Sequence, residues 1–289
     1  MKRIGVLPHT AKPQALAMAQ ELISILEARN VSVWLDKEAA HLLNRPDLNG
    51  EFAGLDAGLV LGGDGAFLRE GRRLAEAGVP MLGINFGRLG FLTEIEPEGV
   101  SQAIDRLLEG DYRIDTRMML RARVVRNKAV RATYYAINDI VVARGTLARS
   151  VHCRLFIDSS FIGVYSGDGM IVATPTGSTA YSLSAGGPIL HPSLNALVVT
   201  PICPHTLGSR SIVTSPEDGV MIRFDEPDEE LLLTVDGQFG ERLFPGDEIH
   251  FDQAPQQARL IRLEARTFYD VLRDRLARKF SDDFQKEDE

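Results

Sequence analysis

Short apolar runs alternate with stretches of helical periodicity through residues 1–97. Strand-like runs occupy residues 3–7, 31–35, 58–61 and 79–84. Residues 13–29 repeat apolar side chains every three or four positions, and residues 66–77 read as a second helix. Strands that alternate with helices predict an α/β N-terminal domain built on a parallel, Rossmann-like sheet. The polar stretch 41–51 predicts a loop.

From residue 98 onward the pattern changes to short apolar runs in close succession. A helix is expected at residues 99–109, and the strand candidates after it are residues 120–125, 134–142, 154–157, 161–165, 170–173, 196–200, 220–224, 231–235, 248–251 and 260–263. Many short strands with close turns predict a β-rich, sandwich-like C-terminal domain at residues 98–267. Asp236-Gly237 is a candidate hairpin turn. The helical spacing of apolar residues in 269–280 suggests that the tail, 268–289, packs back on the first domain.

A glycine-rich turn separates the apolar run 58–61 from the helix that follows it. Gly62, Gly63 and Gly65 surround one carboxylate, Asp64. Glycines allow a ligand to approach the main chain, and the free N–H groups of a helix start favour phosphate oxygens. An aspartate at the carboxyl end of such a strand suits a kinase base that orients a substrate hydroxyl. An ordinary tight turn is the alternative, and the chain has no Walker-type phosphate loop.

Small and hydroxyl-bearing residues are densest in the stretch 166–188. Asp168 lies between two glycines there, and a strand candidate runs into the turn Thr174-Pro175-Thr176-Gly177-Ser178-Thr179. Such a turn suits the hydroxyls and phosphates of a nucleotide, and Tyr181 could stack on a ring. The alternative is a hydroxyl-rich helix cap and turn with no ligand.

Two further polar positions interrupt apolar strands. Asn138-Asp139 divides the run 134–142, and Asn85 follows the run 79–84 at the edge where Asp64 also lies. Buried polar groups must find partners, so these side chains are candidates for a ligand site. A surface bulge at Asn138-Asp139 and a loop-tip turn at Asn85 remain the alternatives.

Composition and charge narrow the function classes. The chain has 289 residues, 44% of them hydrophobic and 25% charged, with a net charge of −8. The negative balance argues against a nucleic-acid partner, and no apolar run approaches the length of a membrane span. Without a signal-peptide pattern, and with two cysteines far apart, the protein is expected in the cytoplasm with reduced thiols. The scattered histidines identify no metal ligands.

Taken together, these motifs resemble those of the ATP-dependent NAD kinase family. The resemblance covers essentially the whole chain, and the motifs come in the family's order. It is carried by Gly62-Gly63-Asp64-Gly65, by residues 82–92, by Asn138-Asp139, by residues 174–188 and by Asp236-Gly237-Gln238. The first motif is shared with diacylglycerol kinase-like and phosphofructokinase-like relatives, whereas residues 174–188 are more specific to NAD kinases. The chain has Asn138-Asp139 where the family often has Asn-Glu, and Ala66 where it often has a hydroxyl residue.

The resemblance implies that the γ-phosphoryl group of ATP is transferred to the 2′-hydroxyl of the adenosine ribose of NAD, giving NADP. It implies ATP as donor, a divalent cation, most simply Mg²⁺, and a homodimer or homotetramer assembled through the β-rich domain. Asp64 is implied as the proton acceptor, and Gly62, Gly63 and Asn85 as the phosphate loop. The residues implied in NAD binding are Asp64, Gly65, Asn138, Asp139, Arg149, Ser166, Asp168, Thr179, Ala180, Tyr181, Ser182, Leu183, Ser184 and Gln238.

Two other functions remain open on the sequence. A lipid or sugar kinase could share the glycine-aspartate turn, although the hydroxyl-rich run and the lack of a membrane-facing segment disfavour a lipid acceptor. A non-catalytic dinucleotide-binding regulator could share the scaffold, although an intact Asp64 disfavours it. A phosphoryl-transfer assay distinguishes these from an NAD kinase.

Overall fold

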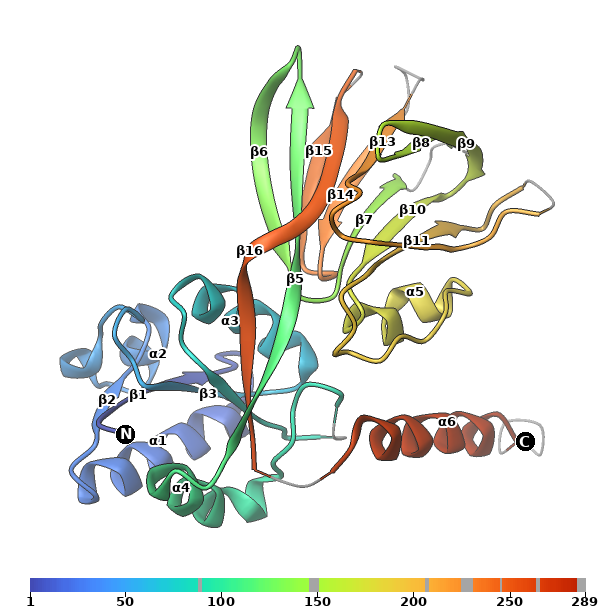
Figure 1. Cartoon of the computed structure of the whole chain (residues 1–289). Coiled ribbons are helices and arrows are strands. Elements are labelled where there is room, and N and C mark those ends of the chain that lie inside the picture. The colour runs from blue at the N-terminus through green and yellow to red at the C-terminus, as the bar shows by residue number, and fades with distance from the viewer. Residues whose placement is uncertain are drawn as a thin grey trace. The chain divides into compact units, whose positions relative to one another are not determined.

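The computed structural model (Figure 1) describes residues 1–87, 90–145, 151–205, 208–224, 231–244, 246–263 and 266–284. These residues form two compact units. The first unit holds Met1–Glu70, Val79–Asp115 and Arg259–Glu289, and the second holds Gly71–Gly78 and Thr116–Ala258. The predicted domain limits at residues 97 and 267 remain a prediction.

The first unit is an α/β unit with a parallel sheet. Its strands β1 (Arg3–Pro8), β2 (Ser32–Trp34), β3 (Ala57–Leu61) and β4 (Met81–Ile84) lie in the order β2-β1-β3-β4 and are all parallel. Its helices are α1 (Pro13–Ala28), α2 (Lys37–Leu42), α4 (Val100–Glu109), α6 (Phe268–Phe284) and the first turns of α3 (Asp64–Glu76). The predicted parallel α/β fold is confirmed.

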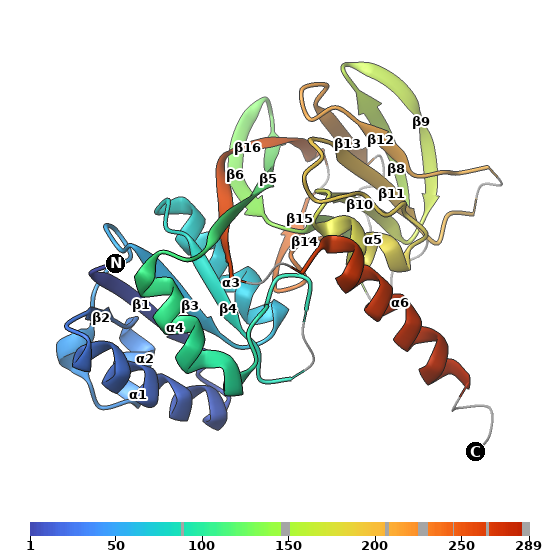
Figure 2. The same cartoon turned by 60° about the horizontal axis from the view of Figure 1, so that its bottom comes forward.

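Alternate side chains of the strands place helices on both faces of this sheet. Leu59 and Leu61 of β3 lie in one core with apolar side chains of α1, α2 and α4. On the opposite face, a side chain at Gly83 of β4 would meet the ring of Phe67 of α3 at about 2.8 Å. A strand presents successive residues to opposite faces, so helix α3 covers the face that α1 does not. Figure 2 shows α1 and α4 together on one side.

The second unit is β-rich and built from two sheets. One six-stranded sheet has the order β12-β11-β10-β7-β14-β15, and strands β13, β8, β9, β5 and β6 belong to the other with β16. Their bounds are β5 (Arg113–Arg126), β6 (Ala129–Ala136), β7 (Asp139–Arg144), β8 (Val151–Ile157), β9 (Ser160–Gly167), β10 (Gly169–Ala173), β11 (Leu197–Ile202), β12 (Ile212–Thr214), β13 (Val220–Phe224), β14 (Leu231–Val235), β15 (Phe239–Leu243) and β16 (Glu248–Arg262). Apolar side chains of both sheets form one core, which confirms the sandwich-like prediction.

Four expected elements are wrong in detail. The expected strand 134–142 is two strands, because residues 137–139 turn to donate their N–H groups to Asp236. The expected strands 248–251 and 260–263 are parts of one long strand, β16. The expected loop 41–51 contains the end of α2, whose start is capped by Asp36, and a 3-10 turn at Pro46–Leu48. Among the described residues, no helix is long and apolar enough to cross a membrane.

Candidate active site

Asp64 is the first residue of α3 and follows the carboxyl end of β3. The turn before it is tight: a methyl group on Gly62 would lie 2.6 Å from the β-carbon of Ala66. Glycine at position 62 is therefore required by close approach, and neither Gly62 nor Gly63 has a left-handed backbone conformation. A small residue at position 66 belongs to the same contact, which accounts for Ala66 at this buried position.

The carboxylate of Asp64 is surrounded by donors. Its Oδ1 accepts from the backbone N–H groups of Leu92 and Thr93, at 3.4 and 3.3 Å, and from Thr93 Oγ1 at 3.1 Å. Its Oδ2 accepts from the N–H of Phe91 at 3.2 Å and lies 3.7 Å from Arg275 Nη2. About a third of the side chain remains exposed, so a ligand can still reach it.

The other predicted residues of the phosphate loop lie beside Asp64. Asn85 is buried, and its Oδ1 lies 3.7 Å from the point where a β-carbon on Gly63 would stand. Gly65 is exposed in the first turn of α3. The structure thus brings Gly62, Gly63, Gly65 and Asn85 to one edge of the parallel sheet, at the carboxyl ends of β3 and β4, where open α/β sheets bind ligands.

A second cluster, within the β-rich unit, is centred on Asp236. Its buried carboxylate accepts from the backbone N–H groups of Ile137, Asn138 and Asp139, at 3.2, 2.8 and 3.2 Å. Arg72, from the last turns of α3, donates to the same carboxylate at 2.6 Å. Asp236 therefore fixes the turn at residues 137–139, which carries the two predicted residues Asn138 and Asp139.

Asp139 is almost completely buried next to this aspartate. Burial, and then the charge of Asp236, raise the pKa of Asp139 to about 7. A carboxyl with this pKa is mainly protonated at mildly acidic pH and then carries an O–H donor. Asn138 is only half-buried, so its side chain is the more accessible of the two.

The hydroxyl-rich turn at residues 174–178 packs against the same turn. Thr174 Oγ1 donates to the carbonyl of Ile137 at 2.6 Å, and its N–H donates to the carbonyl of Asn138 at 2.9 Å. A methyl group on Gly177 would lie 2.1 Å from that carbonyl oxygen. Thr174 and Ser178 thus use their hydroxyls on the protein itself, as the alternative of a capped turn expects.

The residues after this turn divide into buried and accessible positions. Ser182 is fully buried and shares a 2.9 Å hydrogen bond with Thr200 Oγ1, so its hydroxyl serves the fold. Tyr181, the first residue of the short helix α5 (Tyr181–Ser184), is 46% exposed. Partial burial raises the pKa of the Tyr181 hydroxyl, with smaller effects of the charges of Cys203, Asp168 and Asp139. Among the remaining predicted positions, Thr179, Ala180 and Leu183 are half-buried and Ser184 is exposed.

Two predicted residues lie at the N-terminal end of β10, opposite to the end that leads into Thr174. Asp168 and Ser166 precede that strand, whereas Thr174 follows it, and a five-residue strand rises roughly 16 Å in all. Arg144 Nε donates to Asp168 Oδ1 at 2.7 Å, and this hydrogen bond holds the pKa of Asp168 below its ordinary value. The structure does not bring Ser166 and Asp168 to the turn at Asn138.

Two predicted residues remain, Gln238 and Arg149, together with several site residues that the sequence did not predict. Gln238 is exposed, and its Oε1 accepts from Arg72 at 3.3 Å; Arg149 lies outside the described residues. The sequence interpretation missed Arg72, which pairs with Asp236, and Arg144, which pairs with the predicted Asp168. It also missed Thr93 and Arg275, which contact the predicted Asp64. No motif marks them, because each is paired with a residue far along the chain.

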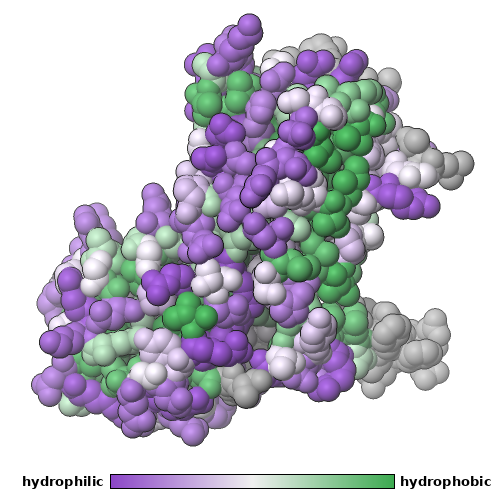
Figure 3. All heavy atoms as spheres, viewed as in Figure 1, coloured by the Kyte–Doolittle hydropathy of each residue, from purple (hydrophilic) through white to green (hydrophobic). Residues whose placement is uncertain are grey.

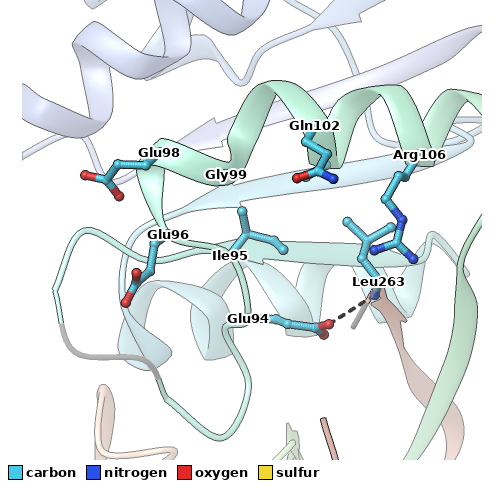
Figure 4. Close-up of a pocket in the computed structure, with 9 residues that line it drawn as sticks. Glu94, Ile95, Glu96, Glu98, Gly99, Gln102, Arg106 and Leu263 are labelled. Carbon is cyan, nitrogen blue, oxygen red and sulfur yellow. Dashed lines mark hydrogen bonds between the residues drawn. The ribbon is translucent and has the colours of Figure 1, made fainter. Parts of the chain in front are cut away.

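The first unit also contains a cavity of about 210 Å³, lined by residues of α4 and of the segment before it (Figure 4). The wall includes Glu94, whose carboxylate accepts the N–H of Leu263, and Arg106. None of the predicted site residues lines this cavity. Among the described residues, no group of three or more His, Cys, Asp and Glu side chains is placed to hold a metal ion.

The fold and the Asp64 cluster define a class of protein. An aspartate and free N–H groups at a glycine turn, at the carboxyl end of a parallel strand, suit a kinase, which binds phosphates and positions a hydroxyl group.

Comparison with known proteins gives the family. Residues 4–112 match the ATP-NAD kinase N-terminal domain, and residues 137–263 match the ATP-NAD kinase C-terminal domain. An NAD kinase of Moorella thermoacetica is 46% identical over 280 residues, covering 96% of this chain and 89% of that protein. An NAD kinase of Symbiobacterium thermophilum is 44% identical over 281 residues, covering 96% and 99%.

Solved structures agree in fold. A crystal structure of yeast NADH kinase complexed with NADH has a TM-score of 0.86 at 23% identity, covering 96% of this chain and 88% of that one. An NAD kinase from Archaeoglobus fulgidus in complex with ATP has a TM-score of 0.72 at 25% identity, covering 94% and 99%. The chain belongs to the ATP-NAD kinase family, and its activity is phosphoryl transfer from ATP to NAD.

Proposed function

We propose that Asp64 is the base of this NAD kinase reaction. It is supported by one observation: Asp64 is a partly exposed carboxylate at a helix start, held in place by the N–H groups of Phe91, Leu92 and Thr93. Three backbone donors fix the carboxylate in one orientation, and phosphoryl transfer depends mainly on such positioning.

The 2′-hydroxyl oxygen of the adenosine ribose of NAD attacks the γ-phosphorus of ATP, and the new O–P bond forms as the bond to the β-phosphate oxygen breaks. The hydroxyl proton passes to Asp64, and ADP leaves with the electron pair of the broken bond. The N–H groups at the start of α3, with Gly62, Gly63 and Asn85, face the phosphates of the donor.

The dinucleotide is assigned to the Asp236 cluster and the α5 region. Asn138 and Asp139 offer an amide and a carboxyl to the ribose, and the exposed ring of Tyr181 offers a stacking surface. The other predicted positions of this region are half-buried or exposed: Thr179, Ala180, Leu183, Ser184 and Gln238. Ser182 anchors α5 through its hydrogen bond with Thr200. Ser166, Asp168, Arg149 and Gly65 stay predicted NAD contacts.

The cation and the assembly are also proposals. Mg²⁺ usually keeps several waters and is bound through substrate phosphates, so we assign it to ATP rather than to a protein ligand set. When bound, it neutralises phosphate charge. We further propose that the protein works in the cytoplasm as a homodimer or homotetramer, joined through the β-rich unit.

A coupled NADP-formation assay tests the function. It uses purified protein, ATP and Mg²⁺ with NAD or NADH as acceptor, and compares the native protein with Asp64→Asn. Removing the base should lower kcat by about 10²-fold or more while NAD binding, measured by calorimetry, is retained. Asp47→Asn, a surface aspartate paired with Arg45, is the matched control and should keep full activity. Near-native kcat in Asp64→Asn would refute the assignment of the base.

A further inference from the structure

The C-terminal helix α6 brings a positive charge to the Asp64 carboxylate. Nη2 of Arg275 lies 3.7 Å from Asp64 Oδ2, and the same guanidinium lies 5.4 Å from the centre of the Phe91 ring. Phe91 in turn contacts Phe268, at the start of α6, with ring centres 6.1 Å apart. Helix α6 is thus attached to the 91–93 segment, the segment whose N–H groups hold Asp64, and all of these residues belong to the first unit.

The Arg275 guanidinium lies where a phosphoryl group must pass, because the group being transferred comes close to the catalytic base. A general base lies about 2.6–3.2 Å from the hydroxyl that it deprotonates, and reacting atoms approach to about 3–3.5 Å. The transferred phosphoryl group therefore passes within roughly 7 Å of the Asp64 carboxylate. The Arg275 side chain is 45% exposed and long enough to move over that distance.

An arginine side chain is chemically suited to bind the transferred phosphoryl group. A transferring phosphoryl group spreads negative charge over its equatorial oxygens, and a guanidinium offers several N–H donors in a planar fork that matches them. Before the nucleotide binds, the carboxylate of Asp64 lies 3.7 Å from Nη2 of this guanidinium. A phosphoryl group that replaced it as the partner would also leave Asp64 Oδ2 open to the substrate hydroxyl.

We propose that Arg275 is a catalytic residue that binds the γ-phosphoryl group of ATP and leaves Asp64 when it does so. The inference rests on the proposed function, because it needs ATP as donor and Asp64 as base. The C-terminal helix then supplies part of the active site, in addition to packing against the unit that carries it.

The test separates binding of the γ-phosphate from a structural role of α6. Calorimetry measures the affinities of ATP and ADP for the native protein, Arg275→Gln and Arg275→Lys, and steady-state assays give kcat and KM for ATP. Arg273→Gln is the matched control, because Arg273 lies on the same helix, is 72% exposed and pairs only with helix carboxylates in the described contacts.

Arg275→Gln should weaken ATP binding roughly tenfold or more while ADP binding changes little, since a charge-assisted hydrogen bond to the γ-phosphate is lost. The value of kcat/KM for ATP should fall by about 10²-fold. Arg275→Lys should recover part of both losses, and Arg273→Gln should change neither.

Equal losses for ATP and ADP, or no loss for either, would overturn the proposal and leave Arg275 a residue that only anchors α6 on Phe91. The ratio of the two affinities does not depend on how much of a variant is folded, so poor folding cannot imitate the result. If the native protein forms no NADP from ATP and NAD, the proposed function fails instead, and the two failures are distinguishable.

Discussion

At the scale of single residues, the Asp64 carboxylate occupies space that only a glycine leaves open. A methyl group on Gly90 would stand 1.8 Å from Asp64 Oδ1 and 2.1 Å from both the carboxyl carbon and Oδ2. We predict that Gly90→Ala displaces the carboxylate and lowers kcat by about 10²-fold, as expected when a positioned catalytic group moves by about 1 Å. Circular dichroism and the NADP-formation assay would measure stability and turnover side by side.

Gly87→Ala is the control for that substitution. A methyl group on Gly87 would have only Asn85 Oδ1 near it, at 3.9 Å, an ordinary contact. The control should keep its kcat. Equal kcat values in Gly90→Ala and the native protein would show that Asp64 does not need the position it has here.

Asp139 gives the protein a pH-dependent stability of unusual sign. Its pKa of about 7 lies above the ordinary 3.8, so between these values the folded state binds more protons than the unfolded state. The contribution of the Asp139 carboxyl to the free energy of unfolding is therefore fully present below pH 4 and is lost as pH rises toward 7. We predict that Asp139→Asn removes this loss, so that the variant gains on the native protein by up to about 1 kcal/mol per pH unit between pH 5 and pH 7. Urea unfolding at several pH values measures it.

Asp56 offers a control of opposite sign. Its carboxylate accepts from the N–H groups of Lys2 and Arg3, and these hydrogen bonds lower its pKa. Asp56→Asn should therefore lose stability relative to the native protein at neutral pH and lose less as pH falls. A stability difference between native protein and Asp139→Asn that stayed constant from pH 5 to pH 7 would contradict the account of Asp139.

At the scale of elements, helix α3 is joined to the β14–β15 turn by one buried ion pair. Arg72 donates to Asp236, whose side chain has no exposed area, and to Gln238. We predict that Arg72→Gln lowers the free energy of unfolding by about 3 kcal/mol, because it leaves a buried carboxylate without its charged partner. The turn at residues 137–139 should loosen as well, which would raise KM for NAD more than it lowers kcat.

A double-mutant cycle with Asp236→Asn isolates this pair. Once the carboxylate is gone, the loss of Arg72 should cost much less, so the two destabilisations should not add. Strict additivity in urea unfolding would mean that Arg72 stabilises the unit by packing alone. Glu76→Gln, at an exposed position of the same helix, is a matched control that should cost under 1 kcal/mol.

Local sequence patterns predict the helices and strands well, and they predict the contacts between those elements poorly. Helix α1 was expected at residues 13–29 and spans Pro13–Ala28, because its apolar spacing alone defines its buried face. The expected strand 134–142 failed because its break depends on Asp236, almost a hundred residues away. Periodicity records which residues are buried, and it does not record which carboxylate will accept a distant N–H group.

The same limit applies to the candidate site. Gly62, Gly63, Asp64 and Asn85 could be grouped from the sequence because the carboxyl ends of neighbouring parallel strands share an edge. Thr93 and Arg275 could not, since they reach Asp64 from a loop and from the last helix. Ser166 and Asp168 are grouped with residues 174–184 by nearness in sequence, and the length of β10 separates them from Thr174, although the charge of Asp168 still acts on the hydroxyl of Tyr181.

At the scale of the whole molecule, the β-rich unit presents apolar side chains to solvent. Phe161, Ile162 and Val164 of β9 are 54%, 43% and 47% exposed, and apolar residues gather over this part of the molecule in Figure 3. Among the described strands, β9 lies at the end of its sheet and pairs with β8, while its last residues are partly covered, since Ser166 accepts from the N–H of His205 at 2.8 Å. An exposed apolar edge of this kind is typical of an interface, and a second copy of the chain is the partner that the proposed assembly requires.

We predict that Phe161→Glu together with Val164→Glu converts the proposed oligomer to a monomer, because two carboxylates per chain would be buried without partners in the contact. Light scattering after size-exclusion chromatography measures the mass of each form. Leu42→Glu makes the same change at a position of the first unit that is 49% exposed, and it should leave the mass unchanged.

An unchanged mass in the double variant would place the interface elsewhere, and a native protein that is already monomeric would remove the oligomer from the proposed function. Activity of the monomer would then decide whether assembly contributes to catalysis, since a site complete within one chain keeps its kcat when the copies separate.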